Sequence, residues 1–113
     1  MTDRDTPYRF SLVMPVDLEK KARKRAYEMG MIKGGKGMLN GYIKLLIHED
    51  LNARPPLDMN SIAYVGSSHT NMVNLTLDRE IKELALERAK DLGFMYGGKG
   101  NLSMYIRYLI VVC

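Results

Sequence analysis

A short run that alternates between apolar and polar residues occurs twice in this chain, and it constrains the fold more than any other feature. The first copy runs from Arg9 to Met14 and the second from Met72 to Leu77, an offset of 63 from position 9 to position 72. Alternation with a period of two is typical of a β-strand that is buried on one face. Because an isolated two-stranded ribbon is marginal in water, we expect the two copies to pair and the segments that follow them to cover their apolar face.

The two expected strands divide their side chains in the same way. One face of each strand is apolar and should lie on the core, with Phe10, Leu12, Met14, Val73, Leu75 and Leu77. The opposite face is available to a partner and carries Arg9, Ser11, Val13, Met72, Asn74 and Thr76. Since two of these six outward residues are apolar, contact with a partner is favoured over simple exposure to water.

A helix is expected after each strand. In the first copy Leu18, Ala22, Ala26 and Met29 form one apolar stripe, which predicts a helix over residues 16–29 that Gly30 ends. In the second copy the corresponding pattern predicts a helix over residues 79–92, with Asp78 as N-cap and Gly93 as the stop.

A glycine-rich segment and a second helix complete each copy. Three glycines in four residues at 34–37, and again at 97–100, predict loops rather than continued helix. The helices that follow share five identical residues at the spacing of a buried face. These are Leu39, Tyr42, Ile43, Leu46 and Ile47, which recur as Leu102, Tyr105, Ile106, Leu109 and Ile110.

The chain of 113 residues should form one domain with a shared core, because half this length buries too little surface to be stable alone. The expected fold class is α+β, with a two-stranded antiparallel ribbon and four helices in one pseudo-twofold unit. Its repeats span residues 8–48 and 70–113, and residues 49–69 form the linker. Within that linker Ser61–Val65 is apolar enough to pack, but its place is left open.

Several functional classes are disfavoured. One cysteine, Cys113, and two histidines give neither an internal disulfide nor metal-ligand spacing, so we expect no metal. No nucleophile, base and orienting group occur together, so we expect neither an enzyme nor a cofactor. The charged N-terminus lacks the apolar segment of a signal peptide, and no run spans a bilayer, so we expect an intracellular protein without a membrane partner. The net charge of +4 is compatible with an anionic partner.

Two local motifs are set aside. Residues 30–37 read as a glycine-lysine loop close to a P-loop, but Gly37 stands where the Mg²⁺-binding Ser or Thr belongs, and the segment follows a helix rather than a strand. Nucleotide hydrolysis is therefore not expected. The basic run at residues 20–25 spreads around the exposed surface of the first helix, and a solvated face explains it better than a specific contact.

The order of strand, helix, short loop and helix, with a glycine that ends the first helix, resembles the ribbon-helix-helix family of DNA-binding repressors, to which Arc and MetJ belong. The resemblance covers residues 8–48 and 71–111. Most members have one such unit per chain and dimerise, so this chain resembles a dimer whose two units are joined in one polypeptide. In this it is similar to tandem transcription regulators of viruses of hyperthermophilic archaea. The resemblance implies transcription regulation through double-stranded DNA, with cooperative assembly on that DNA.

In that family the outward strand residues read bases in the major groove. Carried onto this chain, the resemblance implies base contacts by Arg9, Ser11, Val13, Met72, Asn74 and Thr76. The chemistry fits, because arginine can bond guanine, asparagine can bond adenine, and apolar side chains can contact thymine methyl groups. Since the two strands differ, we expect an asymmetric site in which each strand reads one half. The alternative is that these side chains only form a solvated face.

The family holds a DNA phosphate at the N-terminus of its second helix, where free amides and the helix dipole favour an anion. The resemblance places this contact at Lys36, Gly37, Met38, Lys99, Gly100 and Asn101. Glycines replace the Ser or Thr that is usual in the family's turn, so which N–H group would bind stays open, and the glycines alone could serve only the turn. The alternative function is a protein-interaction module, such as an antitoxin-like subunit.

Overall fold

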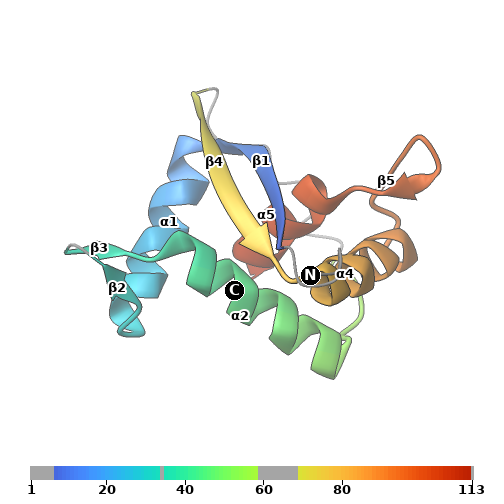
Figure 1. Ribbon diagram of the computed structural model, residues 1–113, viewed down its shortest axis with the longest axis horizontal. Helices are drawn as coiled ribbons and strands as arrows, with labels where there is room; N and C mark the ends of the chain where they lie inside the picture. The colour runs from blue at the N-terminus through green and yellow to red at the C-terminus, as the bar shows by residue number, and fades with distance from the viewer. Residues whose placement is uncertain (1–6, 34, 59–68, 113) are drawn as a thin grey trace.

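The computed structural model describes residues 7–33, 35–58 and 69–112, and within these residues the fold is α+β. The described residues form a long two-stranded ribbon, two short hairpins and four helices (Figure 1). In chain order the elements are β1 (Tyr8–Pro15), α1 (Val16–Glu28), β2 (Ile32–Lys33), β3 (Lys36–Gly37), α2 (Leu39–Ala53), β4 (Thr70–Leu77), α4 (Arg79–Asp91), β5 (Met95–Tyr96), β6 (Lys99–Gly100) and α5 (Leu102–Val112).

The ribbon consists of β1 and β4, which pair antiparallel along their whole length, from Tyr8 opposite Leu77 to Pro15 opposite Thr70. In Figure 1 it crosses the middle of the view. Helix α1 and the β2–β3 hairpin lie on one side of it, and α4 and the β5–β6 hairpin lie on the other. The expected pairing of the two alternating runs is confirmed.

The expected division of strand faces is also confirmed. Leu12, Met14, Val73, Leu75 and Leu77 are all less than 10% exposed, and Phe10 packs partly buried against the same core. Residues of α2 and α5 supply much of the rest of this core, because their repeated apolar residues lie on the buried side of each helix. The opposite face of the ribbon therefore lies outside this core.

The first helices follow the expected pattern except at one residue. Leu18, Ala22 and Ala26 of α1 are buried, but Met29 is 52% exposed. The helix ends at Glu28, and Met29 is the C-cap, so its side chain leaves the stripe that the preceding turns define. Gly30 and Gly93 both adopt the expected positive φ, at 81° and 92°. Asp78 occupies the expected N-cap position, but its side chain makes no capping hydrogen bond.

The two glycine-rich segments form short hairpins, not the loops that the sequence predicts. Ile32 pairs with Gly37, and Met95 pairs with Gly100. Glycine is needed at Gly37 and Gly100 because of close packing against the preceding helix. A Cβ atom on Gly37 would lie 2.0 Å from the backbone oxygen of Arg23, and one on Gly100 would lie 2.2 Å from that of Leu86. Glycine thus lets each hairpin lie directly against the preceding helix.

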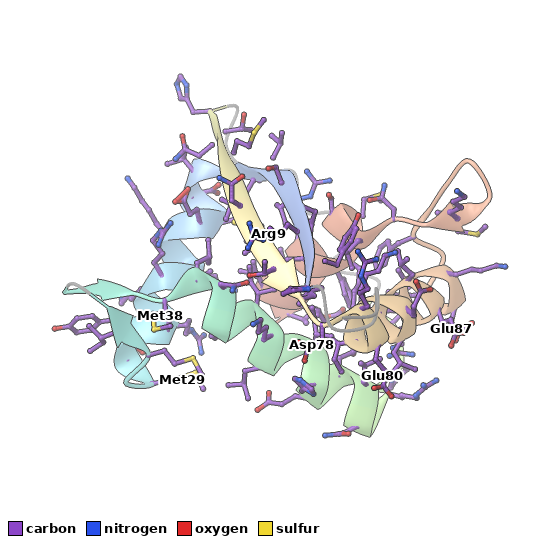
Figure 2. All side chains as sticks on the ribbon, in the orientation of Figure 1. Arg9, Met29, Met38, Asp78, Glu80 and Glu87 are labelled. Carbon is purple, nitrogen blue, oxygen red and sulfur yellow. The ribbon has the colours of Figure 1, made fainter. Side chains whose placement is uncertain are left out.

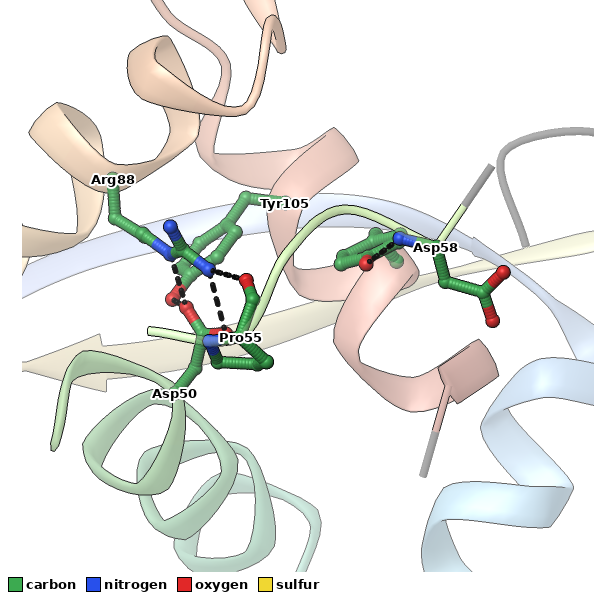
Figure 3. Close-up of polar contacts among 6 residues, drawn as sticks. Asp50, Pro55, Asp58, Arg88 and Tyr105 are labelled. Atoms are coloured by element: carbon green, nitrogen blue, oxygen red, sulfur yellow. Dashed lines mark hydrogen bonds and ion pairs between the residues drawn. The ribbon is translucent and has the colours of Figure 1, made fainter. Parts of the chain in front are cut away.

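Helix α2 continues to Ala53, so residues 49–53 are helical and not part of a linker. This extension places Asp50 in the core, where the carboxylate accepts hydrogen bonds from Arg88 Nε at 2.9 Å and Tyr105 Oη at 2.5 Å (Figure 3). Arg88 Nη2 also donates to the Pro55 carbonyl oxygen at 2.5 Å. Burial and the Asp50 carboxylate raise the pKa of Tyr105 above its ordinary value, so its hydroxyl remains a donor. The expected apolar segment Ser61–Val65 lies outside the described residues.

Candidate nucleic-acid interface

The six outward residues of the ribbon form three cross-strand pairs. Their Cα partners are Arg9 with Thr76, Ser11 with Asn74, and Val13 with Met72. Val13 is 47% exposed and Met72 is 70% exposed, while Thr76 is half-buried. One end of this face is therefore polar and the other is apolar. We call these six residues the ribbon face, and Figure 2 shows Arg9 on it.

The central pair of the ribbon face is joined by a hydrogen bond. Ser11 Oγ donates to Asn74 Oδ1 at 2.5 Å, and both side chains are exposed. A serine hydroxyl can donate to Oδ1 or accept from Nδ2, so this bond joins the two side chains without fixing which end of the Asn74 amide it occupies. In either orientation the amide keeps at least one donor and one acceptor position, which can bond an adenine edge.

Thr76 is held by Asn40, a residue that the sequence did not single out. Asn40 is the second residue of α2. Its Nδ2 donates to Thr76 Oγ1 at 3.1 Å, and its Oδ1 accepts from the Thr76 backbone N–H at 3.2 Å. The local sequence does not point to this role, because the role depends on a contact with a residue 36 positions later.

A pocket of about 670 Å³ lies beside β4, at its junction with α1 and the start of α2. Its walls are Glu19 and Arg23 of α1, residues 37–40, and residues 71–74 of β4. Within the described residues no side chain caps the N-terminus of α2, whose first-turn N–H groups have no partner inside the helix. The pocket therefore adjoins the positive end of the α2 helix dipole.

The acidic group in this pocket is already compensated. Glu19 accepts hydrogen bonds from Asn71 Nδ2 and Arg23 Nε, each at 3.0 Å. Burial by itself raises the pKa of Glu19, but these two bonds and the charge of Arg23 outweigh it and hold the pKa below its ordinary value. Arg23 Nη1 also donates to the Gly37 carbonyl oxygen at 3.3 Å. The carboxylate is therefore ionised and paired rather than directed at a ligand.

The opposite side of the ribbon is built differently. Asn101 precedes α5, and its Oδ1 accepts from the Met104 backbone N–H at 3.1 Å, so the side chain caps that helix. Where α1 has Glu19, α4 has Lys82, whose Nζ lies 4.5 Å from the centre of the Tyr8 ring and 3.3 Å from Glu83 Oε1. The two sides of the ribbon therefore differ in their charged and polar side chains.

Two of the six residues that are expected to contact phosphate use their backbone N–H groups within the protein. The backbone N–H of Met38 donates to the Met31 carbonyl oxygen, and that of Asn101 donates to the Phe94 carbonyl oxygen, both at 2.7 Å. These two amides are used within the protein, because each extends its hairpin ladder. The amides one and two residues later, at Leu39 and Asn40, belong to the first turn of α2, where N–H groups have no acceptor inside the helix.

The expected lysines lie at the hairpins. Lys99 is exposed and pairs with Tyr96 next to the turn of the β5–β6 hairpin. The backbone of Lys36 has the same place in the β2–β3 hairpin, opposite Lys33, but its side chain lies outside what the structure describes. Gly37 and Gly100 are adjacent to these lysines, and close packing explains both glycines.

The described residues offer no candidate for a metal site or a membrane span. Within the described ranges, no three His, Cys, Asp or Glu side chains are grouped so that they could hold a metal ion. No helix in the described part of the chain has the length and apolar character needed to cross a membrane. No protein-family model matches the sequence, and comparisons with curated proteins and with solved structures found no similar protein.

Proposed function

We propose that this chain binds double-stranded DNA by inserting the β1–β4 ribbon into the major groove, and that it regulates transcription in this way. The observation that carries the proposal is the ribbon face, a row of three exposed or half-exposed side-chain pairs on a long antiparallel ribbon. A major groove about 12 Å wide admits a two-stranded ribbon. The opposite face of the ribbon packs on the core, so of its two faces the ribbon face is the one that can meet the bases.

The proposal includes a pseudo-twofold arrangement of two tandem ribbon-helix-helix repeats. An offset of 63 residues relates Ser11 to Asn74, and these two residues are opposite each other in the register. The same offset relates Leu12 to Leu75 and Arg9 to Met72. A twofold axis through the Ser11–Asn74 pair would therefore exchange the two copies. The order of strand, helix, hairpin and helix occurs before and after residues 59–68 and supports this arrangement.

The register of β1 and β4 favours a different asymmetry of the DNA site from the one that the sequence predicts. The sequence predicts that each strand reads one half of the site. However, Arg9 and Thr76 lie together at one end of the ribbon face, and Val13 and Met72 lie together at the other. We therefore propose a polar end that bonds base edges, an apolar end that contacts thymine methyl groups, and a centre read by Asn74.

We further propose that backbone phosphates flank the ribbon at the starts of α2 and α5. The open amides of Leu39 and Asn40 support this on one side, together with the adjacent pocket. On the other side Lys99 supplies a flexible positive charge on the hairpin that leads into α5. Such contacts fix the register of the protein on the duplex without reading sequence.

Selection of binding sites from a randomised duplex tests the proposal. The wild-type chain should enrich one asymmetric core. Arg9→Ala should relax the base preference at one end of that core, and Asn74→Ala at its centre, each by about 1–3 kcal/mol of discrimination. Enrichment of no sequence would disprove DNA reading. A perfectly palindromic core, or relaxation of the same base pair by both variants, would disprove the proposed arrangement.

One observation favours the second candidate, a protein-interaction module. Four apolar side chains on or beside the β2–β3 hairpin are 40–54% exposed, namely Tyr27, Met29, Ile32 and Met38. Figure 2 shows Met29 and Met38 on this flank. A module of this kind would enrich no DNA sequence in the same selection, so one experiment separates the two functions.

A further inference from the structure

We infer that Asn40 is a positioning residue for base recognition, because it makes the Thr76 hydroxyl a hydrogen-bond donor toward the DNA. The inference rests on the proposed function and names the chemistry of one position in its site. Thr76 lies on the ribbon face opposite Arg9, at the polar end. Asn40 reaches it from α2 with two hydrogen bonds.

The orientation of the Asn40 amide follows from the backbone. The Thr76 backbone N–H can only donate, so the Asn40 atom that it meets at 3.2 Å must be the carbonyl oxygen Oδ1. The other end of the amide, 3.1 Å from Thr76 Oγ1, is therefore the NH₂ group. That group can only donate, so it occupies a lone pair of the hydroxyl oxygen.

The hydroxyl proton of Thr76 is then directed away from Asn40. Toward the groove, Thr76 offers this proton to an acceptor such as guanine O6 or N7, or thymine O4. Arg9, the cross-strand partner of Thr76, carries donors only. The polar end of the ribbon face is therefore a cluster of donors, which favours a guanine-rich edge over the amino groups of cytosine and adenine.

The other end of the ribbon has no such arrangement. The residue related to Thr76 by the 63-residue offset is Val13, which has no hydroxyl. Its carbonyl oxygen instead accepts from Arg107 Nη1 at 3.3 Å. The residue related to Asn40 is Ser103, also the second residue of its helix. The chain thus offers a matched control position.

The test is site selection from a randomised duplex with Asn40→Asp, Asn40→Ala and the control Ser103→Asp. In Asn40→Asp both oxygens facing Thr76 are acceptors, so the hydroxyl must turn its proton inward and present lone pairs to the groove. The base preferred opposite Thr76 should change from one that presents an acceptor to one that presents an amino group. Asn40→Ala should reduce the preference at that position by about three- to tenfold, the effect of one hydrogen bond.

Ser103→Asp adds the same negative charge at the start of the other helix. It should weaken binding to all sequences without changing the base preferred opposite Thr76. Thr76→Val removes the hydroxyl with little change in shape, and in that background Asn40→Ala should have no further effect on base preference. If Asn40→Ala acted by loosening β4 instead, its effect on base preference would persist in the Thr76→Val background, so this pair of variants separates the two causes.

The outcomes separate this inference from the proposed function. If the wild-type chain enriches no core, both are overturned. If it enriches a core and Asn40→Asp keeps the wild-type base preference at every position, the inference alone is overturned. The same holds if Asn40→Asp and Ser103→Asp change the preference equally, because charge and not hydroxyl orientation would then explain the effect.

Discussion

Asp50→Ala is expected to lower the free energy of unfolding by about 3–5 kcal/mol, because it leaves a buried guanidinium without its counter-charge. Asp50 and Arg88 are 7% and 8% exposed, and the Tyr105 hydroxyl also donates to this carboxylate. Unfolding in urea, followed by circular dichroism, measures the change as a shift of the midpoint. The pair joins α2 to α4 and so connects the two halves of the chain.

Two variants control this prediction. In the double variant Asp50→Leu/Arg88→Met both charges are gone, so it should be more stable than Asp50→Ala alone. Glu83→Ala breaks an exposed ion pair with Lys82 and should change stability by less than about 1 kcal/mol. A loss as small for Asp50→Ala as for Glu83→Ala would show that the buried network does not hold the two halves together.

Leu12→Ala is expected to lower the free energy of unfolding by about 2–5 kcal/mol, since it removes a buried side chain and leaves a cavity. Leu12 is only 2% exposed and lies on the core face of β1. Its neighbour Ser11 is exposed on the ribbon face, where its one hydrogen bond is to another exposed side chain. Ser11→Ala should therefore change stability by less than about 1 kcal/mol.

The comparison of these two variants by thermal unfolding tests the assignment of strand faces. Val13→Ala is a second control, because Val13 is 47% exposed beside Met72. Equal losses from Leu12→Ala and Ser11→Ala would mean that the ribbon does not present the proposed residues to a partner.

The strands and the helices that face the core could be predicted because their periods are strong and occur twice. Leu12 and Leu75, or Tyr42 and Tyr105, are buried as the alternation and the helical spacing require. The extension of α2 was missed because Asp50 is polar and reads as the start of a linker, whereas its partners Arg88 and Tyr105 are far away in sequence. A buried ion pair has no local signature.

The candidate site was predicted less completely. The outward residues follow from the period of two, but their grouping into a polar and an apolar end depends on the register, which alternation alone does not specify. Asn40 was missed because its role depends on a contact with Thr76, 36 positions later in the chain. Gly37 and Gly100 read as turn glycines, while the contact with a helix carbonyl group appears only in three dimensions.

Methylation interference on the selected duplex shows which groove the β1–β4 ribbon enters. Dimethyl sulfate methylates guanine N7, which lies in the major groove, and adenine N3, which lies in the minor groove. The bound fraction should be depleted of duplexes methylated at guanine N7 in the core, and Arg9→Ala should abolish this depletion at one end of the site only. Depletion at adenine N3 alone, or no depletion in the core, would contradict insertion of the β1–β4 ribbon into the major groove.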